Sequence, residues 1–102
     1  MKKLILAALL VSTAAMAEDR RMLIINKSDE AIIGLYGSDV GKNKWQYNML
    51  AGDAIPVGES RLADFDEGAG WCRFDLLATG AAGGRWEHYN MNVCVGESWT
   101  LR

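Results

Sequence analysis

The sequence predicts an all-β protein: a small antiparallel β-sandwich or flattened barrel of about six to seven strands with one disulfide. Three observations lead to this fold class. Turn-forming residues recur at intervals of about eight to twelve residues, which is the spacing found in small all-β domains. No stretch between residues 22 and 101 keeps a helical period of apolar residues over the roughly ten positions that a helix needs. The chain also contains two cysteines, enough for one covalent cross-link.

The first half of the domain contains three strand patterns and a long loop. "MLIIN" (residues 22–26) is expected to be a strand that ends at the polar turn "KSDE". "AIIGLY" (31–36) is apolar on both faces, so we expect it in the centre of its sheet. Residues 37–48 are rich in Gly and Asn and are expected to form a loop. Residues 55–57 are expected to form a short edge strand, because Pro56 cannot donate a ladder hydrogen bond.

The second half predicts a strand at 61–65, a strand at 71–78, and a hairpin through "TGAAGG" into "RWEHYNMNVC", before a last strand "SWTL". In residues 71–78, a period of two sends alternate side chains to opposite faces. The two expected sets are Cys72, Phe74 and Leu76 on the inner face, and Arg73, Asp75 and Leu77 on the outer face. An α+β alternative needs a helix in "NKWQYNMLAGDAI", which Gly52 and Pro56 disfavour.

Residues 1–17 predict a secretory signal peptide. Two lysines precede an apolar run from Leu4 to Val11, and Ala-Met-Ala precedes the expected cleavage after Ala17. The apolar run is shorter than the roughly 20 residues that a membrane-spanning helix needs. Because the Lys-Lys start is typical of bacteria, we expect a periplasmic or secreted bacterial protein. Residues 18–102 would then form a single β-domain without a transmembrane span.

Charge limits the classes of partner. Cleavage removes Lys2 and Lys3, which leaves nine basic residues against 13 acidic ones, a formal charge of −4. Nucleic acid is a poor partner for such a chain, since phosphate binding needs clustered Lys and Arg. A basic protein or a cation remains possible.

Cys72 and Cys94 are expected to form a disulfide, because an exported chain with two cysteines meets an oxidising compartment. A zinc or redox pair is disfavoured, because the C-x-x-C spacing is absent. With both thiols consumed and His88 the single histidine, the sequence offers no nucleophile and base pair. We therefore expect a protein that is not an enzyme and has no cofactor.

A calcium-linked domain is a further alternative, based on Asp64, Asp66 and Asp75. Asp75 falls twelve positions along if Asp64 is the first ligand, but Gly68 and Ala69 do not fit a calcium-binding helix-loop-helix. Asp75 has a nearer explanation in an ion pair with Arg73 on an exposed face. If that face is covered, Asp75 must accept hydrogen bonds, for example from loop amides, and so has a structural role.

The four tryptophans have two expected roles. Trp71, Trp86 and Trp99 lie on or beside strands and are expected to supply core area. Trp45 differs because it lies in the long loop, and we interpret that loop as a candidate binding surface with Trp45 as its anchor. The expected binding residues are Ser38, Lys42, Lys44, Trp45 and Tyr47, and the expected structural residues are Tyr36, Phe74, Asp75 and Trp99.

The order of motifs resembles a family of small secreted bacterial β-domains. The residues that carry the resemblance are Asn26, "AIIGLYGS", Trp45, "IPVGES", "CRFDL", "NVC" and "WTL". The chain departs from the family pattern at Asp39, where many members have proline. The resemblance implies an antiparallel β fold and a Cys72–Cys94 pairing, and it brings no activity.

These observations predict a non-catalytic periplasmic binding module whose partner is a protein of the cell envelope. A sharper alternative is an inhibitor or immunity protein against a cell-wall-degrading enzyme, since such proteins are often small, exported, disulfide-bonded and acidic.

Overall fold

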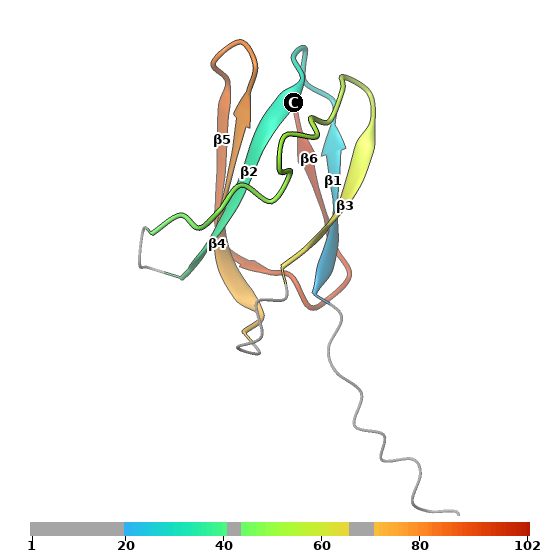
Figure 1. The fold of residues 1–102 in the computed structure, drawn as a ribbon. Coiled ribbons are helices and arrows are strands. Elements are labelled where there is room, and N and C mark those ends of the chain that lie inside the picture. Colours follow the sequence, from blue (N-terminus) through green and yellow to red (C-terminus); the bar gives the residue numbers. More distant parts are fainter. Residues whose placement is uncertain (1–19, 41–43, 66–70) are drawn as a thin grey trace, which may run out of the picture.

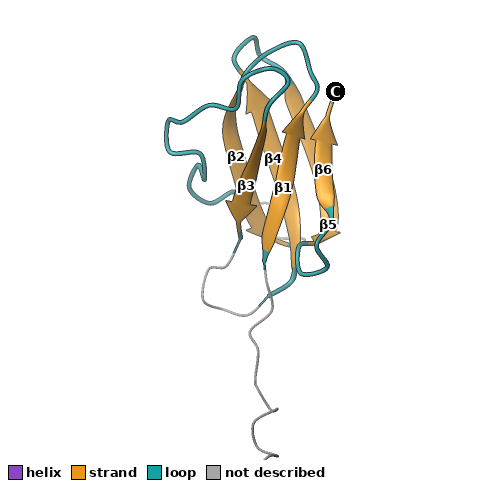
Figure 2. Ribbon diagram, turned by 90° about the vertical axis from the view of Figure 1, so that its right-hand side faces the viewer, coloured by secondary structure: helices purple, strands orange, loops and turns teal. Residues whose placement is uncertain are grey.

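Two three-stranded sheets pack face to face in the computed structural model, which describes residues 20–40, 44–65 and 71–102 (Figure 1). One sheet has the order β3-β1-β6 and the other the order β2-β4-β5. The strands of the described part are β1 (Arg21–Asn26), β2 (Ile32–Asp39), β3 (Ser60–Asp64), β4 (Arg73–Gly80), β5 (Arg85–Asn92) and β6 (Ser98–Leu101). Figure 2 shows the same strands from the side, without a helix among the described residues. The predicted all-β sandwich is therefore confirmed, and the helical alternative for the segment after β2 is wrong.

One strand pair departs from the expected antiparallel arrangement. β1 pairs antiparallel with β3 but parallel with β6, from Leu23 opposite Ser98 to Asn26 opposite Leu101. Parallel neighbours cannot be joined by a tight hairpin. Between β1 and β6 the chain crosses to the other sheet and back twice, so the first and last strands pair only after four intervening strands.

The expectation that residues 31–36 form a central strand is wrong. β2 lies at the edge of its sheet, and β4 is central, between β2 and β5. The apolar pattern of residues 31–36 gave the wrong prediction because Ile33 is exposed despite its apolar side chain. In β4, by contrast, five consecutive residues from Phe74 to Ala78 are buried. Burial on both faces is therefore a property of β4.

The core forms between the two sheets from alternate residues of each strand. Phe74, Leu76 and Ala78 of β4 point inward, and the ring of Phe74 packs against Phe65 with 5.9 Å between ring centroids. The remaining core residues are Met22, Ile24, Ile32, Leu35, Leu50, Ile55, Ala63, Met91, Val93 and Leu101. Trp86 and Trp99 pack against this cluster as predicted.

Several strand bounds differ from those predicted. β2 continues to Asp39 instead of ending at Tyr36, and β4 begins at Arg73 instead of residue 71. The edge strand expected at 55–57 is reduced to one bridge between Ile55 and Ile32. Gly58, with φ of 84°, follows this segment directly and turns the chain out of the extended conformation.

A disulfide joins Cys72 and Cys94, with 5.3 Å between their Cα atoms, as predicted. Cys72 directly precedes β4 and Cys94 follows β5, so the bond closes the open end of the β4–β5 hairpin. It is compatible with an oxidising extracellular compartment. The predicted signal peptide, residues 1–17, lies outside the described residues. In the described part, no helix has the length and apolar character to cross a membrane.

Candidate binding site

The long loop predicted as a binding surface is docked along the free edge of β2. The backbone amide of Gln46 donates to the carbonyl of Gly37 (3.0 Å), and that of Met49 donates to the carbonyl of Leu35 (2.8 Å). An uncovered edge of this kind would offer unpaired N–H and C=O groups to other chains. Residues 44–50 therefore cover the edge of β2, and the same hydrogen bonds fix the backbone conformation of this loop.

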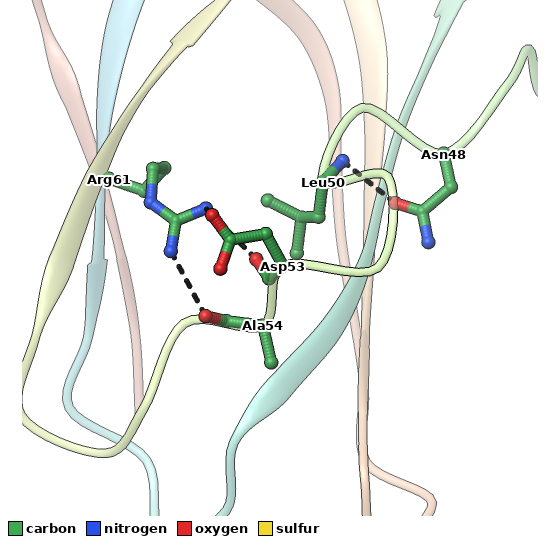
Figure 3. A network of polar contacts seen from close by, with 5 residues as sticks. All are labelled: Asn48, Leu50, Asp53, Ala54 and Arg61. Atoms are coloured by element: carbon green, nitrogen blue, oxygen red, sulfur yellow. Dashed lines mark hydrogen bonds and ion pairs between the residues drawn. The ribbon is translucent and has the colours of Figure 1, made fainter.

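The side chain of Asn48 replaces a missing strand partner in this contact. Its Oδ1 accepts the amide of Leu35 (3.1 Å), and its Nδ2 donates to the carbonyl of Ile33 (2.9 Å). The same Oδ1 accepts the amide of Leu50 (3.0 Å), which is the contact drawn in Figure 3. One amide side chain thus provides hydrogen-bond partners for backbone groups of β2 and of the turn that contains Leu50.

Arg61 of β3 holds the continuation of the loop on the other sheet. Its guanidinium donates to the carbonyls of Asp53 (2.9 Å) and Ala54 (3.0 Å) and lies 3.4 Å from the Asp53 carboxylate (Figure 3). The loop is therefore anchored to β2 at one end and to β3 at the other. Figure 1 shows it in green, crossing from one sheet to the other.

The five predicted binding residues do not share one environment. Ser38 belongs to β2 and is fully buried, with its Oγ accepting the Lys44 amide (3.0 Å), so it shapes the loop and is not available to a partner. Lys44 is exposed, Trp45 is half-buried, and Tyr47 is 70% exposed. Lys42 lies outside the described residues.

A shallow groove of about 380 Å³ lies beside the end of β2. It is lined by Asp39, Val40, Trp71, Cys72 and Arg73, and we name it the Trp71 groove. Trp71 is 57% exposed, so the prediction that it supplies core area is wrong. It precedes β4 in the same phase as Arg73, on the opposite face from Phe74, and that phase could have indicated its exposure.

A second groove of about 280 Å³ adjoins the first. It is lined by Ser38, Asp39, Lys44, Trp45 and Gln46, and we name it the Trp45 groove. Each groove contains one indole and one basic side chain, and Asp39 lines both. Three of the predicted binding residues, Ser38, Lys44 and Trp45, thus line a concave surface, although Ser38 itself is fully buried.

Asp39 differs from the other polar residues of this region. Its Oδ1 atom is buried and accepts no hydrogen bond, and it is the only such side-chain oxygen or nitrogen in the described part of the chain. In native proteins, buried polar atoms almost always have a partner. This oxygen lies below the surface, so it is not exposed to either groove.

Asp75 has the opposite environment, with a clear structural role. β5 carries a bulge in which Tyr89 and Asn90 face the single residue Asp75, and Asn90 has φ of 57°. Asp75 is buried, and its Oδ1 accepts the backbone amide of Asn90 (2.9 Å). The guanidinium of Arg73 donates to the carbonyl of the same Asn90 (3.2 Å). Because Asp75 is covered, the expectation that it lies on an exposed outer face with Arg73 is wrong.

The calcium alternative finds no cluster in the described residues. Asp64 ends β3 in one sheet, Asp75 lies in β4 of the other, and Asp66 lies outside the described part. No three His, Cys, Asp or Glu side chains of the described ranges are grouped to hold a metal ion.

Several titratable side chains of β5 contact neighbouring side chains. His88 stacks on Trp99 of β6, with 6.0 Å between ring centroids. Glu87 accepts hydrogen bonds from the Tyr89 hydroxyl and from Nε of Arg85 (2.7 Å). The Tyr89 hydrogen bond, followed by that of Arg85, lowers the pKa of Glu87, and the same bond to Glu87 raises the pKa of Tyr89.

No known protein family, curated protein or solved structure matches this chain. The candidate site therefore depends on its geometry alone. Its strongest feature is the pair of adjoining grooves.

Proposed function

We propose that this protein is a non-catalytic interaction module of the bacterial periplasm, which binds a protein of the cell envelope through the Trp45 and Trp71 grooves. The observation that carries this proposal is the pair of adjoining grooves, each lined by an indole. Tryptophan is enriched among the residues that dominate protein interfaces, because it buries a large area with few rotatable bonds. A docked loop also reduces the ordering entropy lost on binding.

Binding is favoured over catalysis by what the reactive side chains do. Both cysteine sulfurs form the disulfide, so neither is available as a thiolate nucleophile. His88 stacks on Trp99, and Asp75 accepts the amide of Asn90. These groups contribute to the structure of the β4–β5 hairpin and its contact with β6.

The periplasmic part of the proposal depends on the predicted signal peptide, with support from the disulfide. Measurement of the N-terminal residue of the exported protein tests it. A mature chain that begins at Glu18 is expected, and an uncleaved chain in the cytoplasm would contradict export.

A narrower candidate is an inhibitor or immunity protein against a cell-wall-degrading enzyme. The formal charge of −4 expected after cleavage favours a basic target. Size-exclusion chromatography with a panel of lysozymes and amidases tests this candidate. A stable complex supports it, and the lack of any complex across the panel counts against it.

The test of the binding surface is a pull-down from a bacterial envelope extract with the mature protein as bait. We expect Trp71→Ala and Trp45→Ala each to recover less partner than the wild type. Leu62→Ala is the matched control, because Leu62 is 54% exposed, similar to Trp71, but lies on β3 in the other sheet. Equal recovery by all four proteins would show that the grooves are not the interface.

A further inference from the structure

The two edges of the β2-β4-β5 sheet differ in whether they are covered. Residues 44–50 cover the edge of β2, whereas β5 forms the opposite edge without a covering segment among the described residues (Figure 1). An uncovered edge strand presents a row of N–H and C=O groups that can pair with another strand. The edge of β5 is therefore a candidate interaction surface, separate from the two grooves.

The pairing of β5 with β4 fixes which of its backbone groups point outward. The amide of Gly80 donates to the carbonyl of Gly84 (2.9 Å) at the turn of the hairpin. Hydrogen-bonded and non-hydrogen-bonded pairs alternate from there along the antiparallel ladder, so the backbone groups of Arg85 and Glu87 point away from β4. Within the described part of the chain, no hydrogen bond reaches these outward groups.

The side chains of this stretch are complementary to a second copy of themselves. Arg85 and Glu87 are two positions apart on one face of β5, and Nε of Arg85 lies 2.7 Å from Oε2 of Glu87. When two β5 strands run antiparallel with Trp86 at the two-fold axis, Arg85 of each copy lies opposite Glu87 of the other. Opposite charges in directly opposed positions stabilise a strand pair, and like charges destabilise it.

Trp86 supplies an apolar contact at the centre of the same arrangement. Its half-buried indole packs against the core, and the indole N–H donates to the carbonyl of Arg102 (3.0 Å). The ring lies over Gly84, where a Cβ would come within 2.6 Å of it, so the indole extends along the strand towards the turn. Side chains of a non-hydrogen-bonded pair approach each other closely, and aromatic pairs stabilise paired strands. Pairing of two β5 strands therefore covers the exposed part of both indoles.

We propose that two copies of this protein associate through the β5 edge, antiparallel, with Arg85 opposite Glu87 of the second copy and Trp86 opposite Trp86. Each Arg85–Glu87 pair then exchanges two backbone hydrogen bonds, and the two three-stranded sheets become one continuous sheet. The bulge at Asn90 and the turn after Gly80 limit the pairing to a short stretch. The dimer is therefore weak and depends on protein concentration.

Association at this edge leaves both grooves open. Arg85 and Glu87 pair with residues near the turn of the β4–β5 hairpin, whereas Trp71 and Arg73 of the Trp71 groove lie at its open end. The dimer thus presents each groove twice, which strengthens attachment to a partner with repeated sites. The inference goes beyond the proposed function and does not depend on it, since the β5 contact needs no envelope partner.

The first test is sedimentation velocity of the mature protein from about 10 µM to about 1 mM, where we expect a monomer–dimer equilibrium. Arg85→Glu and Glu87→Arg each place like charges opposite one another, so each should weaken dimerisation by about tenfold or more. The double variant Arg85→Glu/Glu87→Arg restores opposite charges and should dimerise like the wild type.

Matched controls separate this contact from general effects of net charge. Lys27→Glu and Glu59→Arg make the same two charge changes at exposed positions next to strands of the other sheet, so they should dimerise like the wild type. Melting temperatures measured on dilute samples show that each variant is folded.

The second test locates the contact by amide hydrogen exchange. In concentrated samples the amides of Arg85 and Glu87 should exchange more slowly than in dilute ones, by about threefold or more. The amide of Leu62 is the control. It also points outward, from the edge of β3, because the carbonyl of Glu59 accepts the amide of Asn26 (2.9 Å) and the pairs alternate from there. Its exchange should not depend on concentration.

Three results would overturn the proposal. They are a monomer at every concentration, a dimer that the single charge reversals do not weaken or the double variant does not restore, and a dimer that protects Leu62 instead of Arg85 and Glu87. The pull-down distinguishes this inference from the proposed function. A bait that dimerises through β5 but captures no envelope partner supports the β5 contact and counts against the proposed function.

Discussion

At the scale of single residues, two aspartates near one end of the β2-β4-β5 sheet have opposite environments. Asp75 is buried but accepts the Asn90 amide, so its carboxylate stabilises the bulge of β5. Asp39 has a buried oxygen that accepts nothing. The first carboxylate is explained by the fold, and the second is not.

A residue-scale prediction concerns pH and the contact between Glu87 and Tyr89. The hydrogen bond from Tyr89 and the ion pair with Arg85 lower the pKa of Glu87 from its usual 4.5. These contacts therefore stabilise the folded protein above pH 4.5, and their contribution is lost as the pH falls through the lowered pKa. The pKa of Tyr89 is raised from 10.0, so its stabilisation is present below that pH and is lost as the pH rises through the raised pKa. Tyr89→Phe should therefore raise the pKa of Glu87, measured from the carboxyl carbon by nuclear magnetic resonance. Tyr47→Phe is the control, and equal Glu87 pKa values in both variants would contradict the contact.

At the scale of elements, the β4–β5 hairpin is fastened at both ends. The disulfide closes its open end, and the Glu30 carboxylate accepts the amides of Ala82 (2.6 Å) and Gly84 (3.2 Å) at its turn. A Cβ on Gly84 would lie 2.5 Å from that carboxylate, so glycine is needed for this approach. The hairpin supplies the central strand of its sheet and one wall of the Trp71 groove.

The element-scale prediction concerns the disulfide. The double variant Cys72→Ser/Cys94→Ser should lose about 2–5 kcal/mol of unfolding free energy, because the open chain gains conformational freedom. Urea denaturation followed by far-ultraviolet circular dichroism measures the loss. Wild type reduced under the same conditions should match the variant, and an unchanged midpoint in both would show that the bond does not stabilise the fold.

At the scale of the whole molecule, the β3-β1-β6 sheet is assembled from distant parts of the chain. β6 pairs with β1, the Lys27 amide donates to the carbonyl of Leu101 (2.7 Å), and the Trp86 indole N–H donates to the carbonyl of Arg102 (3.0 Å). Leu101 itself is fully buried. The last strand therefore completes one sheet and also contacts the other.

The prediction at this scale is that a chain ending at Gly96, which lacks β6, does not fold cooperatively. Removal of Leu101 and Trp99 opens the core and leaves one side of β1 without a partner. Loss of the cooperative melting transition and of dispersed amide signals measures this. Arg102→Ala should melt like the wild type, because the Arg102 side chain is exposed. A native spectrum from the truncated chain would refute the role of β6.

Sequence patterns predicted which residues form strands better than they predicted the order of those strands in the sheets. The strands near 22–26, 61–65 and 71–78, the hairpin through "TGAAGG" and the cysteine pairing were all predicted, because alternation and turn chemistry are local. The central position of β4 was not predicted, since it depends on which strands lie on either side. The loop was predicted as a candidate binding surface, but the burial of Ser38 and the exposure of Trp71 were not.

Local sequence patterns are enough to predict β-strands around one small core with one cross-link. A period of two, frequent turns and a single pair of cysteines depend on neighbouring residues and on composition alone. The parallel pairing of β1 with β6 and the groove shared by Asp39 and Trp71 become visible in the folded chain alone. Those contacts join residues far apart in the chain, so they follow from how the two sheets pack and not from any local pattern.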